Sequence, residues 1–229
     1  MNLTNQEAIA ELDADFAKMA VEVGQHAWGL SELTMREKAF VFLAADLCGH
    51  CLGFPLQTHV QMALSQGVSL AALREAVRHL APYAGYPTAA EALMMLAEVE
   101  GSHEAVTDPP TPNSPVDFDE TAAAQLAHLD DRFAAFYSKQ FEARWGRSEL
   151  SVRERALATI ATDVLNVTLD DSLRLHVGLA LNNGATEEQV RAVILQVAEF
   201  GIAKAWRAFR SLHGILNAHS GIAASSSGT

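Results

Sequence analysis

The sequence predicts an all-α protein made of two tandem copies of one helical bundle. Segments rich in Ala, Leu, Glu and Met carry apolar residues at three- and four-residue spacing, the period of an amphipathic helix. No alternating run of β-branched residues reaches the length of a strand. The sequence also aligns with itself, without a gap, at an offset of 117 positions over roughly 70 residues. A duplicated helical unit accounts for all three observations.

The internal alignment keeps apolar, charged and imidazole side chains alike. Roughly a third of the aligned positions are identical, which chance does not produce at one fixed offset. The matched pairs include Leu12 and Leu129, Trp28 and Trp145, Arg36 and Arg153, Glu37 and Glu154, Asp46 and Asp163, and His59 and His176.

Each predicted helix is bounded by turn-forming residues. In the first copy the breaks fall at Gly29, Gly53-Phe54-Pro55, Gly67 and Gly85-Tyr86-Pro87. The helices are expected over residues 5–24, 35–48, 56–66, 70–81 and 87–99. The predicted organisation is a first repeat over 1–100, a linker with four prolines over 101–119, a second repeat over 120–219 and a flexible tail over 220–229.

Composition excludes several classes of protein. The 229 residues are 49% apolar, and 28 acidic against 16 basic residues give a net charge of −12, which disfavours nucleic acid as a partner. No run approaches the roughly 20 apolar residues of a membrane span, and the acidic start does not resemble a signal peptide. With only two cysteines, the chain is expected to be cytoplasmic.

The sharpest local motif is Cys48-Gly49-His50-Cys51. Sulfurs three residues apart on a helix are neighbours, so the pair could act as a redox or peroxide-reacting dithiol. Two buried structural cysteines explain the motif almost as well. A metal site would need further ligands such as His50 and His59, and the usual second CxxC is missing, so no metal is expected.

Glu37 and Glu154 allow two interpretations. Thr34-x-x-Glu37 and Ser151-x-x-Glu154 fit the capping box at a helix start, which explains both glutamates without a function. Alternatively, a buried carboxylate at this place could relay protons.

His59 and His176 are the histidines that the repeat retains. A near-neutral imidazole could donate or accept a proton, although a packed, hydrogen-bonded histidine is the other interpretation. The chain has no Gly-rich phosphate loop, GxSxG elbow or HExxH motif, so no nucleotide, flavin or other cofactor is expected.

Four segments carry a resemblance to a known family: LTMREKAFVFLAADL and THVQMALSQGVSLAALREAVRHLAPYAGYPTAAEAL in the first half, and LSVRERALATIATDVL and LRLHVGLALNNGATEEQVRAVILQVAEF in the second. In these segments both halves resemble the carboxymuconolactone decarboxylase family. The resemblance implies the all-α fold shared with the alkylhydroperoxidase D-like (AhpD-like) proteins, which form ring-like trimers or hexamers. A duplicated chain is then expected to assemble as a homotrimer of six pseudo-equivalent units.

The resemblance implies two alternative chemistries. The first is cofactor-independent decarboxylation, or related enolate chemistry, of a small carboxylated lactone. In it Arg36 or Arg153 would anchor a substrate carboxylate, and His59 or His176 would deliver the proton. Glu37 or Glu154 would then orient the histidine.

The second chemistry is an AhpD-like thiol peroxidase or disulfide reductase acting on a hydroperoxide. By the resemblance Cys51 would attack, Cys48 would resolve the sulfenic acid and Glu37 would activate the thiol. However, His59 follows Cys51 by eight residues where the family has four, and the second half has Leu165 and Thr168 in place of the thiols. A third hypothesis is a non-catalytic scaffold or binding protein, in which side chains fill the space beside both histidines.

Overall fold

The computed structural model describes residues 6–100, 116 and 120–226. Within these residues the chain forms twelve α-helices and one short 3-10 helix, and no strand, which confirms the duplicated all-α fold. The first repeat contains α1 (Gln6–Leu12), α2 (Ala14–Gly29), α3 (Met35–Gly49), α4 (Phe54–Ser65), α5 (Leu70–Ala84) and α6 (Tyr86–Glu100). The second contains α7 (Glu120–Leu129), α8 (Asp131–Trp145), α9 (Val152–Asn166), α10 (Asp171–Asn182), α11 (Glu187–Gln196), η1 (Val197–Phe200) and α12 (Ile202–Ser226).

The prediction of one continuous helix over 5–24 is wrong, because the helix is interrupted at Asp13. This residue is extended, with a φ of −159°, and its carboxylate accepts a hydrogen bond from the backbone N–H of Phe16 at 2.8 Å. Asp130 caps α8 in the same way. An aspartate that satisfies a free N–H at a helix start favours a new helix over continuation of the old one.

Two other boundaries differ from the expectation or cannot be compared with it. The predicted linker lies outside the described residues except for Val116. Helix α12 continues to Ser226, so its backbone occupies most of the segment predicted as a flexible tail.

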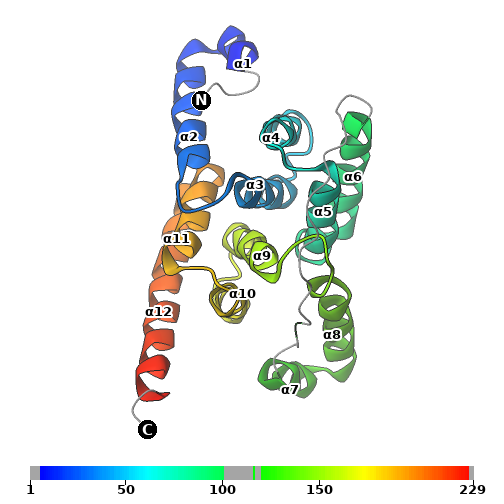
Figure 1. The fold of residues 1–229 in the computed structure, drawn as a ribbon, viewed down its shortest axis with the longest axis vertical. Helices are drawn as coiled ribbons and strands as arrows, with labels where there is room; N and C mark the ends of the chain where they lie inside the picture. Colours follow the sequence, from blue (N-terminus) through cyan, green and yellow to red (C-terminus); the bar gives the residue numbers. More distant parts are fainter. Residues whose placement is uncertain (1–5, 101–115, 117–119, 227–229) are drawn as a thin grey trace.

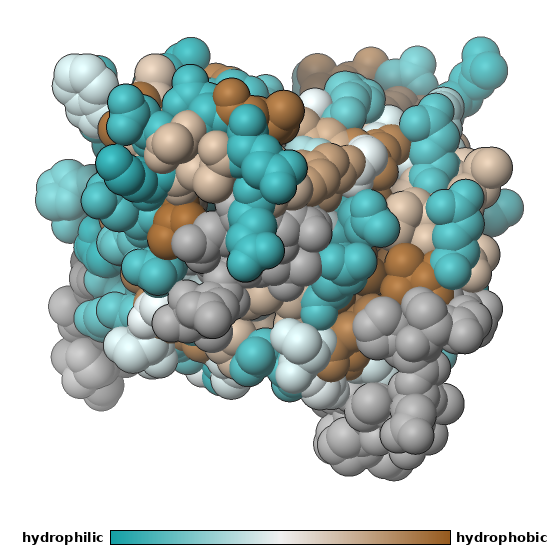
Figure 2. Space-filling model, turned by 90° about the horizontal axis from the view of Figure 1, so that it is seen from above, coloured by the Kyte–Doolittle hydropathy of each residue, from teal (hydrophilic) through white to brown (hydrophobic). Residues whose placement is uncertain are grey.

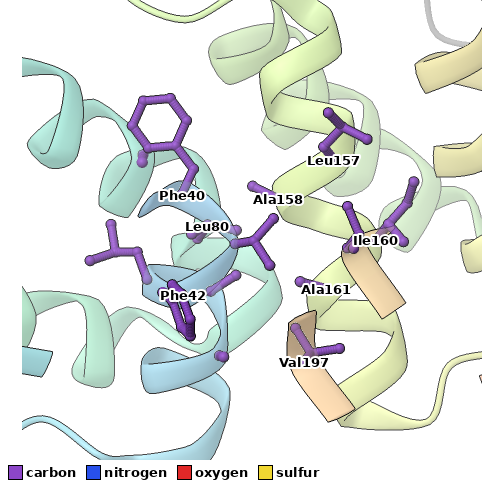
Figure 3. Close-up of a cluster of buried hydrophobic side chains, with 14 of the residues drawn as sticks. Phe40, Phe42, Leu80, Leu157, Ala158, Ile160, Ala161 and Val197 are labelled. Atoms are coloured by element: carbon purple, nitrogen blue, oxygen red, sulfur yellow. The ribbon is translucent and has the colours of Figure 1, made fainter. Parts of the chain in front are cut away.

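The centre of the molecule is the contact between α3 and α9, the equivalent helices of the two repeats (Figure 1). In each of these helices an unbroken run of residues is buried, 37–47 in α3 and 155–165 in α9. Their apolar side chains meet those of α5 and η1 in one cluster (Figure 3). Because this cluster contains residues of both repeats, the two copies share one hydrophobic core.

Two reciprocal ion pairs join the starts of α3 and α9. Nε of Arg36 donates to Glu154 at 2.6 Å, and the guanidinium of Arg153 donates to Glu37 at 2.6 Å. Both glutamates also complete capping boxes, with Thr34 and Ser151, which confirms that interpretation of the sequence. The exchange of equivalent partners shows that the repeats are related by an approximate two-fold axis between these helices.

The surface carries two equivalent apolar ridges. Leu12, Phe16 and Met19 lie at the α1–α2 corner, and Leu129, Phe133 and Phe136 occupy the aligned positions at the α7–α8 corner; all six are at least half exposed. Figure 2 shows how hydrophobic patches alternate with hydrophilic side chains on the end of the molecule seen from above. Among the described helices, none combines the length and the apolar character that a bilayer crossing requires.

Candidate functional site

An aspartate–histidine pair occurs at the same place in both repeats. Nδ1 of His59 lies 2.8 Å from Oδ2 of Asp46, and Nδ1 of His176 lies 2.6 Å from Oδ2 of Asp163. Each aspartate sits in the last turns of a central helix, α3 or α9, and each histidine lies on the following helix, α4 or α10. An ionised aspartate that accepts from Nδ1–H fixes the imidazole tautomer and leaves Nε2 as the nitrogen that can exchange a proton.

A left-handed residue sets the turn between the two helices of each pair. His50 ends α3 with a φ of 53°, and Val167 ends α9 with a φ of 61°. This conformation is uncommon without glycine, and least favourable for a β-branched residue such as valine. Since the fold imposes the same turn on His50 and Val167, it is the turn, and not the local side chain, that positions the aspartate–histidine pair.

In the first repeat the pair opens onto a cavity of about 170 Å³. His59 forms part of the wall, and its side chain keeps 17% of its surface exposed. The wall also includes Glu199, from η1 of the second repeat, so the cavity draws on both halves of the chain. The cavity is lined by Ile9, Ala20, Val21, Gly24, Trp28, Phe42, Phe54, Pro55, Thr58, His59, Met62 and Glu199.

Stacked rings hold the His59 imidazole in place. Its ring lies nearly parallel to that of Phe42, with a centroid distance of 4.3 Å, and Phe42 in turn stacks on Trp28 at 4.7 Å. Phe200, also from the second repeat, closes one side at 6.1 Å. With Nδ1 held by Asp46 and one ring face covered by Phe42, the orientation of Nε2 is fixed.

In the second repeat the equivalent histidine is sealed. His176 is fully buried, stacks on Trp145 at 5.8 Å and meets the edge of Tyr83 at 5.4 Å. Its Nε2 has no hydrogen-bond partner within the described part of the chain. The second pair therefore has the geometry of the first without its access to a ligand.

Two substitutions between aligned positions explain the difference in access. Ala20 and Gly24 line the first cavity, whereas the aligned residues of α8 are Tyr137 and Phe141. Phe141 is buried and stacks on Trp145 at 5.1 Å, so its ring occupies space that a glycine leaves empty. The small residues of α2 therefore leave room for the cavity in the first repeat, where the second repeat has aromatic side chains.

The two aspartates also differ in their hydrogen bonds. Oδ1 of Asp163 accepts from the hydroxyls of Thr168 and Ser172, at 2.8 and 2.6 Å. The residues aligned with those donors are Cys51 and Pro55. Oδ1 of Asp46 is buried and has no hydrogen-bond partner among the described residues. Burial raises the pKa of Asp46, and its hydrogen bond to His59 opposes that shift.

The cysteines are free thiols in an environment that disfavours thiolate. Burial raises the pKa of Cys48 to about 12, although nearby Lys204 and Asn166 act in the opposite direction. Burial and the charge of Asp46 also raise the pKa of Cys51, whose thiol faces the Gly49 carbonyl at 3.4 Å. A raised pKa is the reverse of the shift that activates a nucleophilic cysteine.

The structure separates the predicted arginines and glutamates from the histidines they were expected to assist. Arg36 and Arg153 bind Glu154 and Glu37 at the contact between α3 and α9, and none of the four residues lines the His59 cavity. The carboxylate that contacts His59 is Asp46. The internal alignment contained the Asp46–Asp163 match, but the spacing of 13 residues across a turn gave no sign of contact with the histidine.

Glu199 was not among the residues predicted from the sequence. Part of its surface is exposed to solvent, while much of the space around its carboxyl group is occupied by protein. This partial burial raises the pKa of Glu199 to about 7, and the nearby His59 acts in the opposite direction. The position aligned with it is Pro82, so the repeat gave no signal for it. Among the described residues, no three His, Cys, Asp or Glu side chains gather closely enough to hold a metal ion.

Comparison with known proteins shows the family to which the chain is similar. Residues 14–98 and 130–213 each match the model of the carboxymuconolactone decarboxylase family. The fold is similar to a crystal structure from Burkholderia xenovorans LB400, provisionally assigned as a gamma-carboxymuconolactone decarboxylase subunit. That similarity has a TM-score of 0.56 and 19% identity, over 97% of this chain and 92% of the other. Comparison with curated proteins gave no match.

Proposed function

Because the chain belongs to the carboxymuconolactone decarboxylase family, we propose that it is a cofactor-independent enzyme that moves a proton on a small cyclic substrate. In this proposal the first repeat carries the working site, and His59 exchanges the proton through Nε2 with a carbon next to a carbonyl group. Asp46 holds the imidazole and stabilises its protonated form. The second repeat serves as the scaffold that contributes Glu199 and Phe200.

One observation carries the proposal: only one of two equivalent Asp–His pairs lines a cavity large enough for a ligand. Most of the cavity wall is apolar, and an apolar surrounding strengthens the electrostatic effect of nearby charged groups. A histidine whose tautomer is fixed by a carboxylate can first accept a proton from an enolisable carbon and then return it.

Among reactions of this kind, the family and the assignment of the Burkholderia protein favour decarboxylation of a carboxylated lactone. Loss of CO₂ leaves an enolate, and the protonated Nε2 of His59 would supply the proton that quenches it. In this reaction Arg36 and Arg153 would not anchor the substrate carboxylate as expected, because both arginines form ion pairs with glutamates.

The observations give less support to the other two hypotheses. A thiol peroxidase would use Cys51 and Cys48, both of which have raised pKa values. A scaffold would have side chains filling the space beside both histidines, which describes the surroundings of His176 but not those of His59.

The test uses small lactones with and without a carboxylate group, incubated with the protein in D₂O. Deuterium uptake is followed by NMR, and release of CO₂ is measured in parallel. We expect His59→Ala to lower the rate by about 10²- to 10⁴-fold, as loss of a general acid–base does, and His176→Ala to change it by less than about threefold. A rate that survives His59→Ala, or that is lost in His176→Ala with the fold intact, would contradict the proposal.

We also propose that copies of the chain associate through the two apolar ridges. The ridges occupy aligned positions and expose large apolar side chains such as Phe16 and Phe133. Exposed apolar patches of this kind are typical of surfaces that bind another protein. Light scattering of the parent and of a Phe16→Ser/Phe133→Ser variant would test this. We expect the parent to be a trimer and the variant to shift toward monomer; a monomeric parent would refute the proposal.

A further inference from the structure

The walls of the His59 cavity indicate what kind of molecule fits it. Nine of the twelve lining residues are apolar, and the polar ones are Thr58, His59 and Glu199. The volume of about 170 Å³ is close to that of engineered apolar cavities, roughly 150 Å³, that bind benzene. Size and lining therefore match a ligand with a single ring.

The charges around the cavity are unfavourable for an anion. The described lining residues include no Lys or Arg, and His59 is the only basic group among them. Two carboxyl groups stand nearby: Glu199 in the wall, and Asp46 behind His59. A carboxylate that enters such a site loses hydration without gaining the permanent positive charge of a Lys or Arg, and it meets the negative charges of Glu199 and Asp46, so its transfer from water is costly.

Of the two carboxyl groups near the cavity, Asp46 has an equivalent in the second repeat, Asp163, whereas Glu199 has none. It comes from η1 of the opposite repeat, whereas the aligned residue in the first repeat is Pro82, which has no carboxyl group. The acidic wall is thus specific to the open cavity. Ionisation of Glu199 adds a negative charge to the wall, while neutral Glu199 can donate a hydrogen bond to a carbonyl or hydroxyl oxygen.

We propose that the His59 cavity selects an uncharged, single-ring molecule with one oxygen substituent, and that Glu199 is the residue that excludes ring carboxylates. This proposal rests on the proposed function, since it concerns the same site. It changes the expected chemistry: an uncharged ring has no carboxylate to lose, so the natural reaction becomes proton transfer on a neutral cyclic carbonyl or enol.

The test compares para-cresol with para-toluate, two rings of similar size that differ in charge at neutral pH. Binding to the parent, to Glu199→Gln and to Gly24→Phe is measured by NMR titration. Gly24→Phe copies Phe141 and should abolish binding of both probes. Glu22→Gln is the matched control, because Glu22 shares a neighbouring surface hollow with Glu199 but does not line the cavity.

At pH 8 we expect the parent to bind para-cresol at least about tenfold more tightly than para-toluate. Glu199→Gln should raise the affinity for para-toluate roughly tenfold and leave that for para-cresol within about threefold. Glu22→Gln should resemble the parent. Equal affinities of the parent for both probes, an unchanged ratio in Glu199→Gln, or no binding of para-cresol would each overturn the proposal.

The pH dependence supplies a second readout. The titratable groups that face Glu199 are His59 on α4, Asp46 on α3, and Glu22 and His26 on α2. Burial raises the pKa of Glu199 to about 7, so its negative charge forms as the pH rises from 6 to 8. Over this range para-toluate affinity should fall more steeply in the parent than in Glu199→Gln, because the variant retains only the titration of the other groups. Parallel profiles would contradict the role of Glu199.

The two proposals fail in different ways. If para-cresol binds as expected but no lactone exchanges deuterium through His59, the selectivity stands and the proposed reaction is wrong. If deuterium exchange depends on His59 but charged and uncharged rings bind equally, the reaction stands and the selectivity is wrong.

Discussion

The two Asp–His sites have the same hydrogen-bonded pair and the same left-handed turn after the central helix, yet only the pair in the first repeat opens onto a cavity. Around His59 the wall of α2 is built from small residues, while around His176 the same wall of α8 carries Phe141 and Tyr137. Within the described ranges, Asp46 keeps a buried carboxylate oxygen without a hydrogen-bond partner, whereas both carboxylate oxygens of Asp163 are hydrogen-bonded. After the duplication, one copy has a closely packed site whose aspartate is fully hydrogen-bonded, while the other has an open site with an unpaired buried oxygen within the described residues, a departure from ideal packing that is typical of functional sites.

The largest effect on stability should follow from reopening the second site. Phe141→Ala removes a buried ring that stacks on Trp145, and we expect the free energy of unfolding to decrease by roughly 3–5 kcal/mol. Denaturant unfolding measures this change. Phe136→Ala, on the same helix but 56% exposed, should cost less than about 0.5 kcal/mol. Equal effects of the two variants would mean that Phe141 does not fill the second site.

A smaller loss is expected at the symmetric contact between the repeats. Arg153→Ala leaves the buried Glu37 without its ion-pair partner and should cost about 1–3 kcal/mol. Arg174→Ala, which breaks an exposed pair with Asp171, should cost less than about 1 kcal/mol. Binding of para-cresol to Arg153→Ala should match the parent, because Arg153 does not line the cavity. Loss of binding with an intact fold would restore the arginine to the site.

The difference between the aspartates can be tested by transferring the donor of the second site to the first. Cys51→Thr places a hydroxyl where Thr168 donates to Asp163, and we expect about 1 kcal/mol of added stability at pH 7. Thr168→Val is the converse change and should lower stability by about 1–3 kcal/mol.

Cys51→Thr should also change the pH dependence of the free energy of unfolding. Burial raises the pKa of Asp46, so between its ordinary and its folded value the unfolded chain has released a proton that the folded chain still holds. The free energy of unfolding therefore falls as the pH rises through that interval. In Cys51→Thr the new hydrogen bond should lower the pKa and flatten this fall. An unfolding profile identical to the parent's from pH 4 to 7 would refute the account of Asp46.

The smallest effect concerns the thiols. Because burial raises the pKa of Cys48 to about 12, almost none of this residue is thiolate at pH 7. We expect an organic hydroperoxide to oxidise the reduced protein no faster than it oxidises free cysteine, and Cys48→Ala to keep its rate of deuterium exchange. Rapid loss of both thiols, reversed by a dithiol, would instead favour the peroxidase.

The sequence predicted the parts of the fold that depend on local pattern. Helical periodicity identified the central helix that begins at Met35, and the Thr34 and Ser151 motifs predicted its cap and that of its copy. The break at Asp13 was missed because the apolar spacing continues across it, although an aspartate followed by a new apolar run is a known start signal.

The candidate site was predicted only in part, since its geometry depends on contacts between distant segments. Retention of the histidine in both repeats singled out His59 and His176, which do lie in equivalent sites. Glu199 could not be predicted, because it comes from the opposite repeat and has no acidic counterpart. The alignment of Gly24 with Phe141 was a sign of the cavity in the sequence. Its meaning depends on the contacts of the folded chain, in which Gly24 lines the cavity and Phe141 stacks on Trp145, the ring beside His176.

The most direct test of the difference between the repeats is an NMR titration of the imidazole signals of His59 and His176 with para-cresol. Assignments come from His59→Gln and His176→Gln. We expect the signals of His59 to shift along a single saturable binding curve while those of His176 remain unchanged. Equal shifts of both histidines, or a shift of His176 alone, would contradict this expectation.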